Sequence, residues 1–368
     1  MARSFRIAII GIGAISDVHA KAIADLPQAS LVAGSCRTPE KGQAFASKWH
    51  CTWYSDYNAM LDEARPDVAI IATPSGAHLQ PTLACAERGV HALCEKPLEI
   101  TTARADEMIR AAERAKIQLG GFFPQRFNPV VQTLHQAVAQ GRFGRLATIN
   151  VIVPWWRDDD YYAPQRWQGT LALDGGGALI NQGIHLVDLM QWLGGATMSE
   201  LRPGDNPVRD VFCFADKLAH DPELIEVEDT AVAVARLRNG ALVNILAATS
   251  MHPGSHWRLL VAGSDGSAEI VEDQLISWNY RQASDEDEII RARFSGKTAH
   301  GGGAADPMAM GHANHTGNLR DFLDALEAGR PPLVHAIEAR KALAITQACY
   351  DSASTGSKTS PAPLSVDA

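Results

Sequence analysis

The sequence predicts two domains, an α/β domain built on a parallel sheet and, after it, an α+β domain built on a large, mostly antiparallel open sheet. Two observations support this prediction. The chain has 368 residues, more than a single hydrophobic core usually accommodates. Short apolar strands alternate with helical segments up to Gly121, whereas strands follow one another after it. We therefore expect the domains to span residues 1–122 and 123–368.

The first domain reads as a series of buried strands, each followed by a helix. Residues 5–10 (FRIAII) form an apolar run, and Gly11-Ile12-Gly13 ends it just before a helix that begins near Ile15. Three further strands are expected at residues 31–35, 68–73 and 90–94, with a helix at residues 102–115. This alternation is typical of a parallel sheet that helices cover on both faces.

The second domain reads as one long apolar helix, at about residues 177–193, among strands that turns separate. Asn239-Gly240 is a strong hairpin signal, and a second turn is expected at residues 263–266. We expect irregular structure at residues 283–307, where an acidic cluster precedes three glycines, and in the tail from Ser352. The strands are expected at residues 146–154, 230–237, 241–248, 257–262, 268–272 and 275–280.

The composition excludes several classes of protein. Hydrophobic residues make up 46% and charged residues 20%, which is ordinary for a globular chain. No apolar run approaches the roughly 18 residues of a membrane span, and the start lacks the order of a signal peptide, so we expect a cytoplasmic protein. The net charge of −9, without a Lys/Arg cluster, argues against nucleic acid as a partner. The six cysteines form no C-x-x-C pair, and we expect them to be reduced.

Gly11 and Gly13 lie between a strand and a helix, where dinucleotide-binding folds place their glycine-rich turn. There the bare backbone can approach a pyrophosphate, and the helix N-terminus supplies N–H groups. Ser16 stands where the full fingerprint has a third glycine, so an ordinary strand-to-helix turn is the alternative. The position of this turn at the start of a β-α-β series favours the dinucleotide site.

The end of the second strand, Ser35-Cys36-Arg37-Thr38, bears on the choice between NAD and NADP. An NAD site usually places an acidic residue there to hold the ribose hydroxyls. Here no carboxylate would repel a 2′-phosphate, and Ser35, Arg37 and Thr38 can donate hydrogen bonds to one. We therefore expect NAD(P), with NADP slightly favoured over NAD. The alternative is that Arg37 is only a solvated turn residue.

Several short motifs occur in a specific order along nearly the whole chain. They are Gly11-x-Gly13, Glu95-Lys96-Pro97, Gln125-Arg126-Phe127-Asn128-Pro129, Gly175-Gly176-Gly177-x-x-x-Asn181-x-x-x-His185, Val227-Glu228-Asp229-Thr230, Gly266-Ser267 before Glu272-Asp273, and Asp321-Phe322 to Gly329-Arg330-Pro331-Pro332. Each alone is weak, but together they resemble the Gfo/Idh/MocA family of oxidoreductases. The resemblance implies hydride transfer between a nicotinamide and a carbon that bears a secondary hydroxyl, usually on a sugar or cyclitol.

Lys96 is the first expected catalytic residue. Oxidation of an alcohol needs a group that takes the hydroxyl proton, and a lysine can do this when nearby positive charge or desolvation lowers its pKa. Glu95 can orient the ammonium, and Pro97 restricts the loop. The alternative is a lysine of a surface loop. The family often has a cis peptide before this proline.

Asn181 and His185 are the other expected catalytic residues, because a spacing of four places both side chains on one face of a helix. His185 can exchange a proton near neutral pH. Many members of the family have aspartate at position 181, and an asparagine can orient a substrate but cannot take its proton. The alternative for His185 is a structural helix histidine. We expect Asp188, a further turn along, to be a structural partner.

Aromatic and arginine side chains between the domain junction and this helix suggest a sugar site. Aromatic rings can pack on the apolar face of a pyranose, and an arginine can pair with a carboxylate or phosphate. A role in the core is the alternative for the aromatics. His312 and His315 are weaker candidates, and since they lack a third ligand at useful spacing we expect no metal. The expected substrate-binding residues are Arg126, Trp155, Arg157, Tyr161, Trp167, Asn181 and His185.

The sequence thus predicts an NAD(P)-dependent dehydrogenase or reductase for a sugar, sugar derivative or cyclitol. The alternative is a redox-inactive regulator that binds the dinucleotide and a protein partner. We expect a homodimer or homotetramer through the C-terminal sheet, since one face of that sheet is rich in Val, Leu and Ile. The residues expected at the cofactor are Gly11, Gly13, Ala14, Ile15, Ser35, Arg37, Thr38, Thr73, Pro74, Ser75, His78, Glu95, Lys96 and Gln125.

Overall fold

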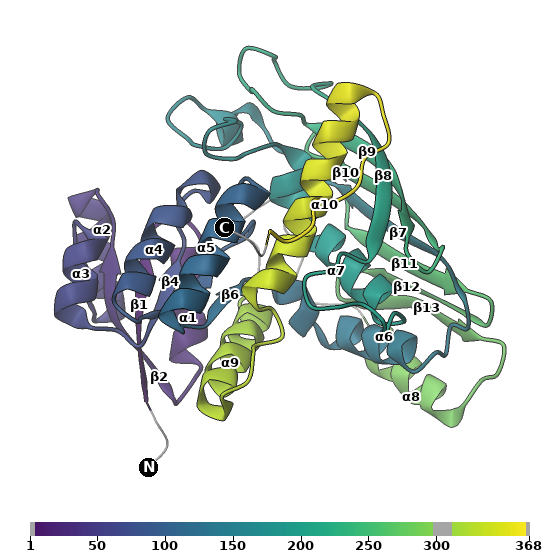
Figure 1. Ribbon diagram of the computed structural model, residues 1–368, viewed down its shortest axis with the longest axis horizontal. Coiled ribbons are helices and arrows are strands. Elements are labelled where there is room, and N and C mark those ends of the chain that lie inside the picture. The colour runs from purple at the N-terminus through teal and green to yellow at the C-terminus, as the bar shows by residue number, and fades with distance from the viewer. Residues whose placement is uncertain (1–3, 297–310, 366–368) are drawn as a thin grey trace. The chain divides into compact units, whose positions relative to one another are not determined.

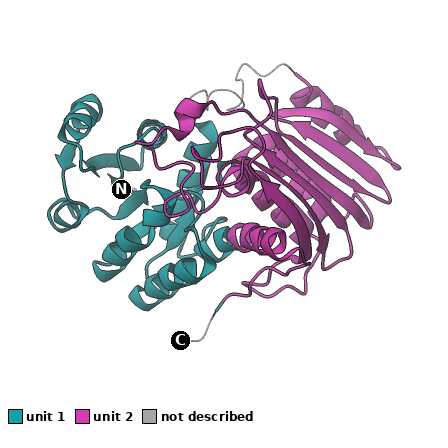
Figure 2. Cartoon of the chain, turned by 90° about the horizontal axis from the view of Figure 1, so that it is seen from above, with its two compact units in different colours: residues 1–124, 311–340, 365–368 teal, residues 125–310, 341–364 magenta. Residues whose placement is uncertain are grey.

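The computed structural model describes residues 4–296 and 311–365, and the chain divides into two compact units (Figure 2). Unit 1 comprises residues 1–124, 311–340 and 365–368, and unit 2 comprises residues 125–310 and 341–364. The first boundary lies next to the expected one. The return of residues 311–340 to unit 1 differs from the expectation of one continuous second domain.

Unit 1 holds a parallel sheet of six strands in the order β3-β2-β1-β4-β5-β6, and Figure 1 labels β1, β2, β4 and β6 of this sheet. The order reverses between β1 and β4, and ligands of such sheets bind where the carboxyl ends of the strands meet this reversal. The sequence did not reveal β3 and β6, which have three residues each. The strands are β1 (Phe5–Ile10), β2 (Ala29–Ser35), β3 (Thr52–Tyr54), β4 (Val68–Ile71), β5 (His91–Cys94) and β6 (Leu119–Gly121).

Helices follow most strands of unit 1, and one further helix of this unit, α9, comes from late in the chain. Leu319, Phe322 and Leu323 of α9 are buried in the same apolar cluster as Ile7 of β1 and Ile23 of α1. This burial explains why residues 311–340 belong to unit 1. The helices are α1 (Ser16–Ala24), α2 (Pro39–Trp49), α3 (Tyr57–Ala64), the 3₁₀ turn η1 (Ser75–Ala77), α4 (Leu79–Glu87), α5 (Thr102–Ala115) and α9 (Ala313–Ala328).

Unit 2 holds a sheet of seven strands in the order β13-β12-β11-β7-β10-β9-β8. Its neighbours are antiparallel except β7 and β10, which are parallel. The hairpin at Asn239-Gly240 is confirmed between β9 and β10, whereas β8 was not expected. The strands are β7 (Leu146–Pro154), β8 (Val208–Asp216), β9 (Thr230–Leu237), β10 (Leu242–Ala248), β11 (Arg258–Gly263), β12 (Gly266–Val271) and β13 (Gln274–Tyr280).

Helical segments cover one face of this sheet, and a π turn that continues as α7 packs on β7 and β10. The other face carries Phe214, Val232, Val234 and Leu242, which are 71%, 43%, 55% and 51% exposed. The uncovered face therefore carries an exposed apolar patch on β8, β9 and β10. The segments are η2 (Pro124–Phe127), α6 (Pro129–Ala139), η3 (Asp159–Tyr162), the π turn η4 (Leu179–Gly183), α7 (Ile184–Gly195), α8 (Asp285–Phe294) and α10 (Ala336–Thr355), which begins in unit 1.

Two segments expected to be irregular are ordered. The acidic stretch forms α8, because Ser284 and Asp287 make a reciprocal capping box at its start. The C-terminal tail continues α10 as far as Thr355, and Thr359 then bridges to Val211 of β8. The three glycines at 301–303 lie outside the described residues. No helix in the described part of the chain is both long and apolar enough to cross a membrane.

Candidate active site

The glycine turn after β1 leaves room above its backbone. Gly11 has φ +101°, and a Cβ there would lie 2.6 Å from the Ala72 carbonyl group, so only glycine fits. A Cβ on Gly13 would meet no atom within 4 Å. Ser16, which replaces the third glycine, donates a hydrogen bond to the Gly13 carbonyl at 2.6 Å and fixes the turn.

The start of α1 is open to an anion. Ala14 is exposed, and the N-cap residue Ile15 makes no side-chain hydrogen bond to the first turn. The first N–H groups of a helix attract negative charge. With Gly13 facing open space, the residues of this turn fit the pyrophosphate of a dinucleotide.

The end of β2 presents one arginine and one threonine. Arg37 and Thr38 are exposed, whereas Ser35 is only 3% exposed, and its carbonyl accepts the Gly11 N–H at 2.9 Å. Ser35 therefore supports the glycine turn through its backbone. Arg37 and Thr38 remain as the groups that can reach a ribose or its 2′-phosphate.

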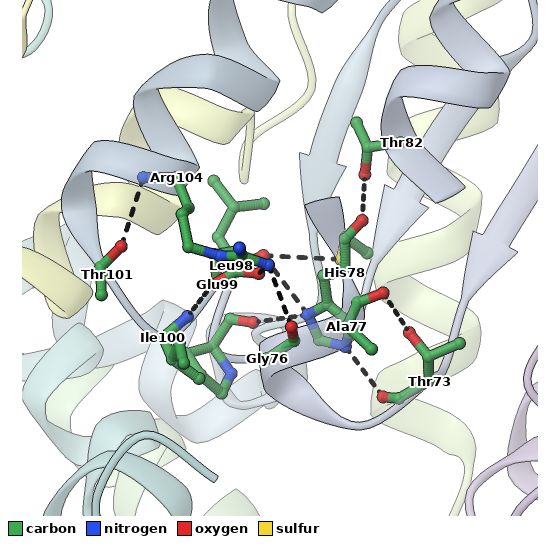
Figure 3. Close-up of polar contacts among 12 residues, drawn as sticks. Thr73, Gly76, Ala77, His78, Thr82, Leu98, Glu99, Ile100, Thr101 and Arg104 are labelled. Carbon is green, nitrogen blue, oxygen red and sulfur yellow. Dashed lines mark hydrogen bonds and ion pairs between the residues drawn. The ribbon is translucent and has the colours of Figure 1, made fainter. Parts of the chain in front are cut away.

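The loops after β4 and β5 are tied together by buried polar groups (Figure 3). The ring of His78 is 1% exposed, with Nδ1 3.0 Å from the Pro97 carbonyl and Nε2 2.9 Å from the Thr73 carbonyl. Burial lowers the pKa of His78. Because both ring nitrogens face backbone oxygens, His78 links the two loops, and its expected role at the cofactor is limited to holding these loops in place.

Arg104 forms a second connection between the loops after β4 and β5, which the sequence did not reveal. Its Nη2 contacts Glu99 Oε1 at 2.7 Å and the Gly76 carbonyl at 3.0 Å (Figure 3). Glu99 is fully buried, and Gly76 lies between Ser75, which is buried, and Ala77 in η1. Thr73-Pro74-Ser75 is therefore held at the carboxyl edge of the sheet.

Glu95 follows β5 and precedes a cis peptide between Lys96 and Pro97. Its Oε2 accepts the backbone N–H of Lys96 at 3.1 Å, and its Oε1 lies 2.9 Å from Nε2 of the buried His19 on α1. Burial opposes ionisation of Glu95, but the His19 contact and the charges of His19, His315 and Lys96 lower its pKa to about 2. The loop that carries Lys96 is thus built on a fixed negative charge.

Neither His19 nor the position of His315 was foreseen. The rings of His19 and Phe122 are 4.4 Å apart, and those of His19 and His315 are 5.7 Å apart. Burial lowers the pKa of His315 to about 4. His312 pairs instead with Asp25 at 3.0 Å. His315 therefore belongs to the buried support of Glu95, and His312 to the packing of α9 on α1.

In unit 2, two distant side chains cap the helix that carries Asn181 and His185. Glu228 Oε2 accepts the N–H of Gly177 at 2.8 Å and Oε1 that of Leu179 at 2.9 Å. The Glu228 carbonyl accepts the Ala178 N–H at 3.1 Å, and the Tyr350 hydroxyl accepts that of Ile180 at 3.2 Å. Four N–H groups that a helix start leaves unpaired are thereby satisfied.

The cap explains two of the three glycines in the motif, Gly176 and Gly177. A Cβ on Gly176 would lie 2.3 Å from the Tyr350 hydroxyl, and a Cβ on Gly177 would lie 1.7 Å from the Glu228 carbonyl oxygen. Larger residues would push the capping groups away. Tyr350 also donates to Glu228 Oε1 at 2.9 Å, so the two capping groups hold each other.

Asn181 lies in a π turn and His185 in the α-helix that follows, whereas the sequence predicted one regular helix. Such π turns occur frequently at functional sites. Asn181 Nδ2 donates to Oδ1 of the buried Asp174 at 2.9 Å, and Asp174 Oδ2 accepts the Gly169 N–H at 2.9 Å. Asp174, which the sequence did not reveal, thus fixes the Asn181 amide. His185 is half-buried.

Arg157 lies among aromatic rings. Its guanidinium carbon is 5.1 Å from the Trp155 ring and 5.5 Å from the Tyr161 ring, and Nη1 donates to the Trp156 carbonyl at 2.7 Å. The Tyr161 hydroxyl accepts from Gln182 Nε2 at 3.2 Å. Burial and then the Asp174 charge raise the pKa of Tyr161 to about 12, so the phenol keeps its proton.

The polar cluster of unit 2 therefore joins the expected residues Trp155, Arg157, Tyr161 and Asn181. Trp167 is half-buried nearby in sequence, and its carbonyl accepts the Thr170 hydroxyl at 2.7 Å. Among the described contacts, none joins the Trp167 indole to this cluster.

Arg126 is not placed to bind a substrate, which corrects our expectation. Its side chain is fully buried and forms two bonds to Asp188, at 2.7 Å from Nε and 2.6 Å from Nη2. Asp188 is the structural partner that the sequence predicted. The neighbouring Gln125 has a buried Oε1 with no hydrogen-bond partner among the residues that the structure describes. Such an atom fits the amide of a nicotinamide.

The comparisons with known proteins cover both units. Residues 5–122 match the sequence model of the oxidoreductase family with an NAD-binding Rossmann fold. Residues 131–269 match that of the Gfo/Idh/MocA C-terminal domain. The two matches together span more than half of the chain.

Individual relatives agree with these matches. The chain is 27% identical to the rhizopine catabolism protein MocA of Rhizobium meliloti over 83% of this chain and 91% of that one. It is 29% identical to the D-glucoside 3-dehydrogenase of Escherichia coli over 65% and 68%. The structure of the WlbA dehydrogenase of Bordetella pertussis, solved with NADH and UDP-GlcNAcA, is 29% identical over 99% of both chains with a TM-score of 0.85. The chain belongs to the Gfo/Idh/MocA family of oxidoreductases.

Proposed function

We propose that the protein is an NAD(P)-dependent dehydrogenase that acts on a secondary alcohol of a sugar, sugar derivative or cyclitol. One observation supports this most strongly. A chain that matches the family in both units keeps Lys96 beside a buried fixed charge and Asn181-x-x-x-His185 on a helix whose start is fully capped. Two of the named relatives are dehydrogenases, one named for D-glucosides and one solved with NADH and UDP-GlcNAcA.

The residues would divide the chemistry as follows. A nicotinamide dinucleotide held at the Gly11-x-Gly13 turn would supply the hydride acceptor, so the hydroxyl proton must go to the protein. The positive charge of an oxidised nicotinamide would offset the negative charge of Glu95 and favour the neutral form of Lys96. Lys96 would then take this proton, and His185 would bond the same oxygen as a second acid or base. Asn181 orients the hydroxyl, since its amide is held by Asp174 and cannot accept a proton.

Arg157 sets the class of substrate in this proposal. Arg157 is only 4% exposed and lies between two aromatic rings, so a substrate carboxylate or phosphate would pair with it as a buried charge while the rings cover a sugar face. We therefore rank a nucleotide-linked sugar acid first, in line with UDP-GlcNAcA in the WlbA complex. A free glycoside is the second candidate, in line with the D-glucoside 3-dehydrogenase.

The cofactor preference follows from the end of β2. Arg37 and Thr38 are exposed there and residues 35–38 contain no carboxylate, although Glu40 follows in the first turn of α2, so we propose that NADP is accepted at least as well as NAD. The Arg37→Ala variant should lose kcat/KM with NADP and keep that with NAD. An equal loss with both cofactors, or none, would contradict the preference.

The uncovered face of the unit 2 sheet is proposed to bind a second copy of the chain. Phe214 pairs with Val232 across β8 and β9, which makes the exposed apolar surface continuous. We expect a dimer or tetramer in sedimentation. The Val234→Lys variant should dissociate into monomers. The control is Ile289→Lys, which replaces an exposed apolar residue on α8 and should leave the assembly intact. A monomeric wild-type protein would refute this assembly.

An activity screen tests the central proposal. Purified protein is mixed with NAD or NADP and a panel of UDP-sugar acids, glycosides and inositols, and the absorbance of reduced nicotinamide is followed. We expect turnover of at least one compound, and Lys96→Ala should lose about 100-fold or more of kcat. The matched control is Lys41→Ala, at an exposed lysine of α2. Cofactor binding without turnover, and without an effect of Lys96→Ala, would favour the regulator.

A further inference from the structure

We propose that Glu228 and Asp229, two adjacent carboxylates just before β9, are the positioning residues of the substrate site. Glu228 fixes the helix that carries Asn181 and His185, and Asp229 fixes the loop that carries Arg157. This inference rests on the proposed function, because it assigns a purpose to the Val227-Glu228-Asp229-Thr230 motif within that site.

The two carboxylates enter separate networks from one short segment. Both are buried, Glu228 at 9% and Asp229 at 0% exposure, so their role is to hold other groups in place. Glu228 reaches the N–H groups of Gly177 and Leu179, whereas Asp229 reaches those of residues 218–220. Successive side chains of an extended segment point to opposite sides, which explains how neighbours serve different targets.

The Glu228 network ends close to the reacting groups. Asn181 is two residues from Leu179, and His185 follows in the same continuous helical segment. Loss of an acceptor at Glu228 would leave N–H groups of a buried helix start unpaired, and the start would shift to recover a partner. Such a shift moves Asn181 and His185 together.

The Asp229 network reaches Arg157 through a histidine. Asp229 Oδ2 lies 3.0 Å from Nδ1 of the buried His220, and His220 Nε2 lies 2.8 Å from the Arg157 carbonyl oxygen. The His220 ring also stacks on Trp156, with ring centroids 5.4 Å apart. The His220 imidazole thus contacts both the Trp156 side chain and the Arg157 backbone of this loop.

A second connection from Asp229 runs through the backbone. Its carbonyl accepts the Thr249 N–H at 2.8 Å, and the Thr249 carbonyl accepts the Arg157 N–H at 2.9 Å. The Thr249 hydroxyl accepts that of Tyr162 at 2.8 Å, and Tyr162 is the neighbour of Tyr161. The segment from Trp155 to Tyr162 therefore depends on Asp229 at several points.

The two networks predict separate kinetic effects. Misplacing Asn181 and His185 should slow the chemical step, so we expect Glu228→Gln to lower kcat by about 10- to 100-fold with little change in the substrate KM. Misplacing Arg157 should weaken substrate binding, so we expect Asp229→Asn to raise the substrate KM by about 10-fold with a smaller change in kcat. The cofactor KM should change in neither variant.

Asp287 provides the matched control. It is another fully buried carboxylate of unit 2, and it caps α8 and pairs with Arg142 at 2.7 Å. The Asp287→Asn variant should lose stability without separating kcat from KM. If Glu228→Gln and Asp229→Asn behave as Asp287→Asn does, the carboxylates serve only stability and the inference is refuted.

Two milder substitutions test the inference if the carboxylate variants do not fold. Tyr350→Phe removes one capping group of the helix start and should lower kcat. His220→Gln removes the link to the Arg157 carbonyl and should raise the substrate KM. Wild-type values for both variants would overturn the inference while leaving the proposed function intact, whereas a wild-type protein without any turnover would refute the function itself.

Discussion

Glu95 in unit 1 and Glu228 in unit 2 are both 9% exposed, yet their pKa values are shifted in opposite directions. Burial raises the pKa of both. At Glu95 the contact with His19 and its charge, followed by smaller contributions that include Lys96, more than offset burial, and the pKa falls to about 2. Glu228 has only N–H dipoles and the Tyr350 hydroxyl around it, and its pKa rises to about 7. Formal charge among the partners, more than burial, decides whether a buried carboxylate is a fixed charge.

The opposite shifts have opposite consequences for stability. Glu95 favours the folded state above its unfolded pKa of 4.5, and this contribution is lost as pH falls toward 2. Glu228 holds its proton in the folded state while the unfolded chain releases it, so its contribution is present below pH 4.5 and is lost as pH rises through 7.

The largest expected effect comes from removing the fixed charge. Glu95→Gln leaves His19 without its anionic partner, and we expect a loss of about 3 kcal/mol in the free energy of unfolding, as for other broken buried pairs. Urea unfolding measures it, with Glu63→Gln on the surface of α3 as the control. If Glu95→Gln loses no more free energy of unfolding than Glu63→Gln does, the Glu95–His19 pair does not stabilise the fold.

A smaller effect should distinguish Glu228 by its pH dependence. Between pH 5 and 8 the wild type loses about 2 kcal/mol of stability through Glu228, and Glu228→Gln, which has no ionisation there, does not. The free energy of unfolding of Glu228→Gln, relative to that of the wild type, should therefore increase by about 2 kcal/mol between pH 5 and 8. A difference independent of pH would mean that Glu228 does not titrate in this range.

The smallest expected effect concerns the glycine turn. A Cβ on Gly13 meets no protein atom, so Gly13→Ala should leave the free energy of unfolding within about 0.5 kcal/mol of the wild type. The added methyl group would stand where the pyrophosphate approaches, and we expect the dinucleotide Kd to rise about 10-fold. Calorimetry with NADP measures this. Unchanged affinity would place the cofactor elsewhere.

The sequence predicted the strands that are long enough for their pattern of apolar residues to be recognised. Residues 5–10 and 146–154 match β1 and β7 at both ends. The missed strands β3 and β6 have three residues each, which is too short for periodicity. In β8, charged residues such as Arg209, Asp210 and Asp216 hide the alternation.

The site was predictable where chemistry lies in one local motif. Lys96, Asn181 and His185 belong to such motifs, whereas the groups that cap the start of the helix carrying Asn181 and His185 come from far along the chain. Glu228 is 51 residues from Gly177, and Tyr350 is 170 residues from Ile180. Arg126 was misjudged for the same reason, since its partner Asp188 is 62 residues away.

Direct transfer of hydrogen tests the account's central claim. A substrate found in the screen is prepared with deuterium on every ring carbon, and the reduced nicotinamide is analysed by mass spectrometry after turnover by the wild-type protein. We expect each reduced nicotinamide to gain one deuterium, because the hydride leaves the carbon of the alcohol. Reduced cofactor without deuterium, or a cofactor that binds and is never reduced, would contradict the assignment.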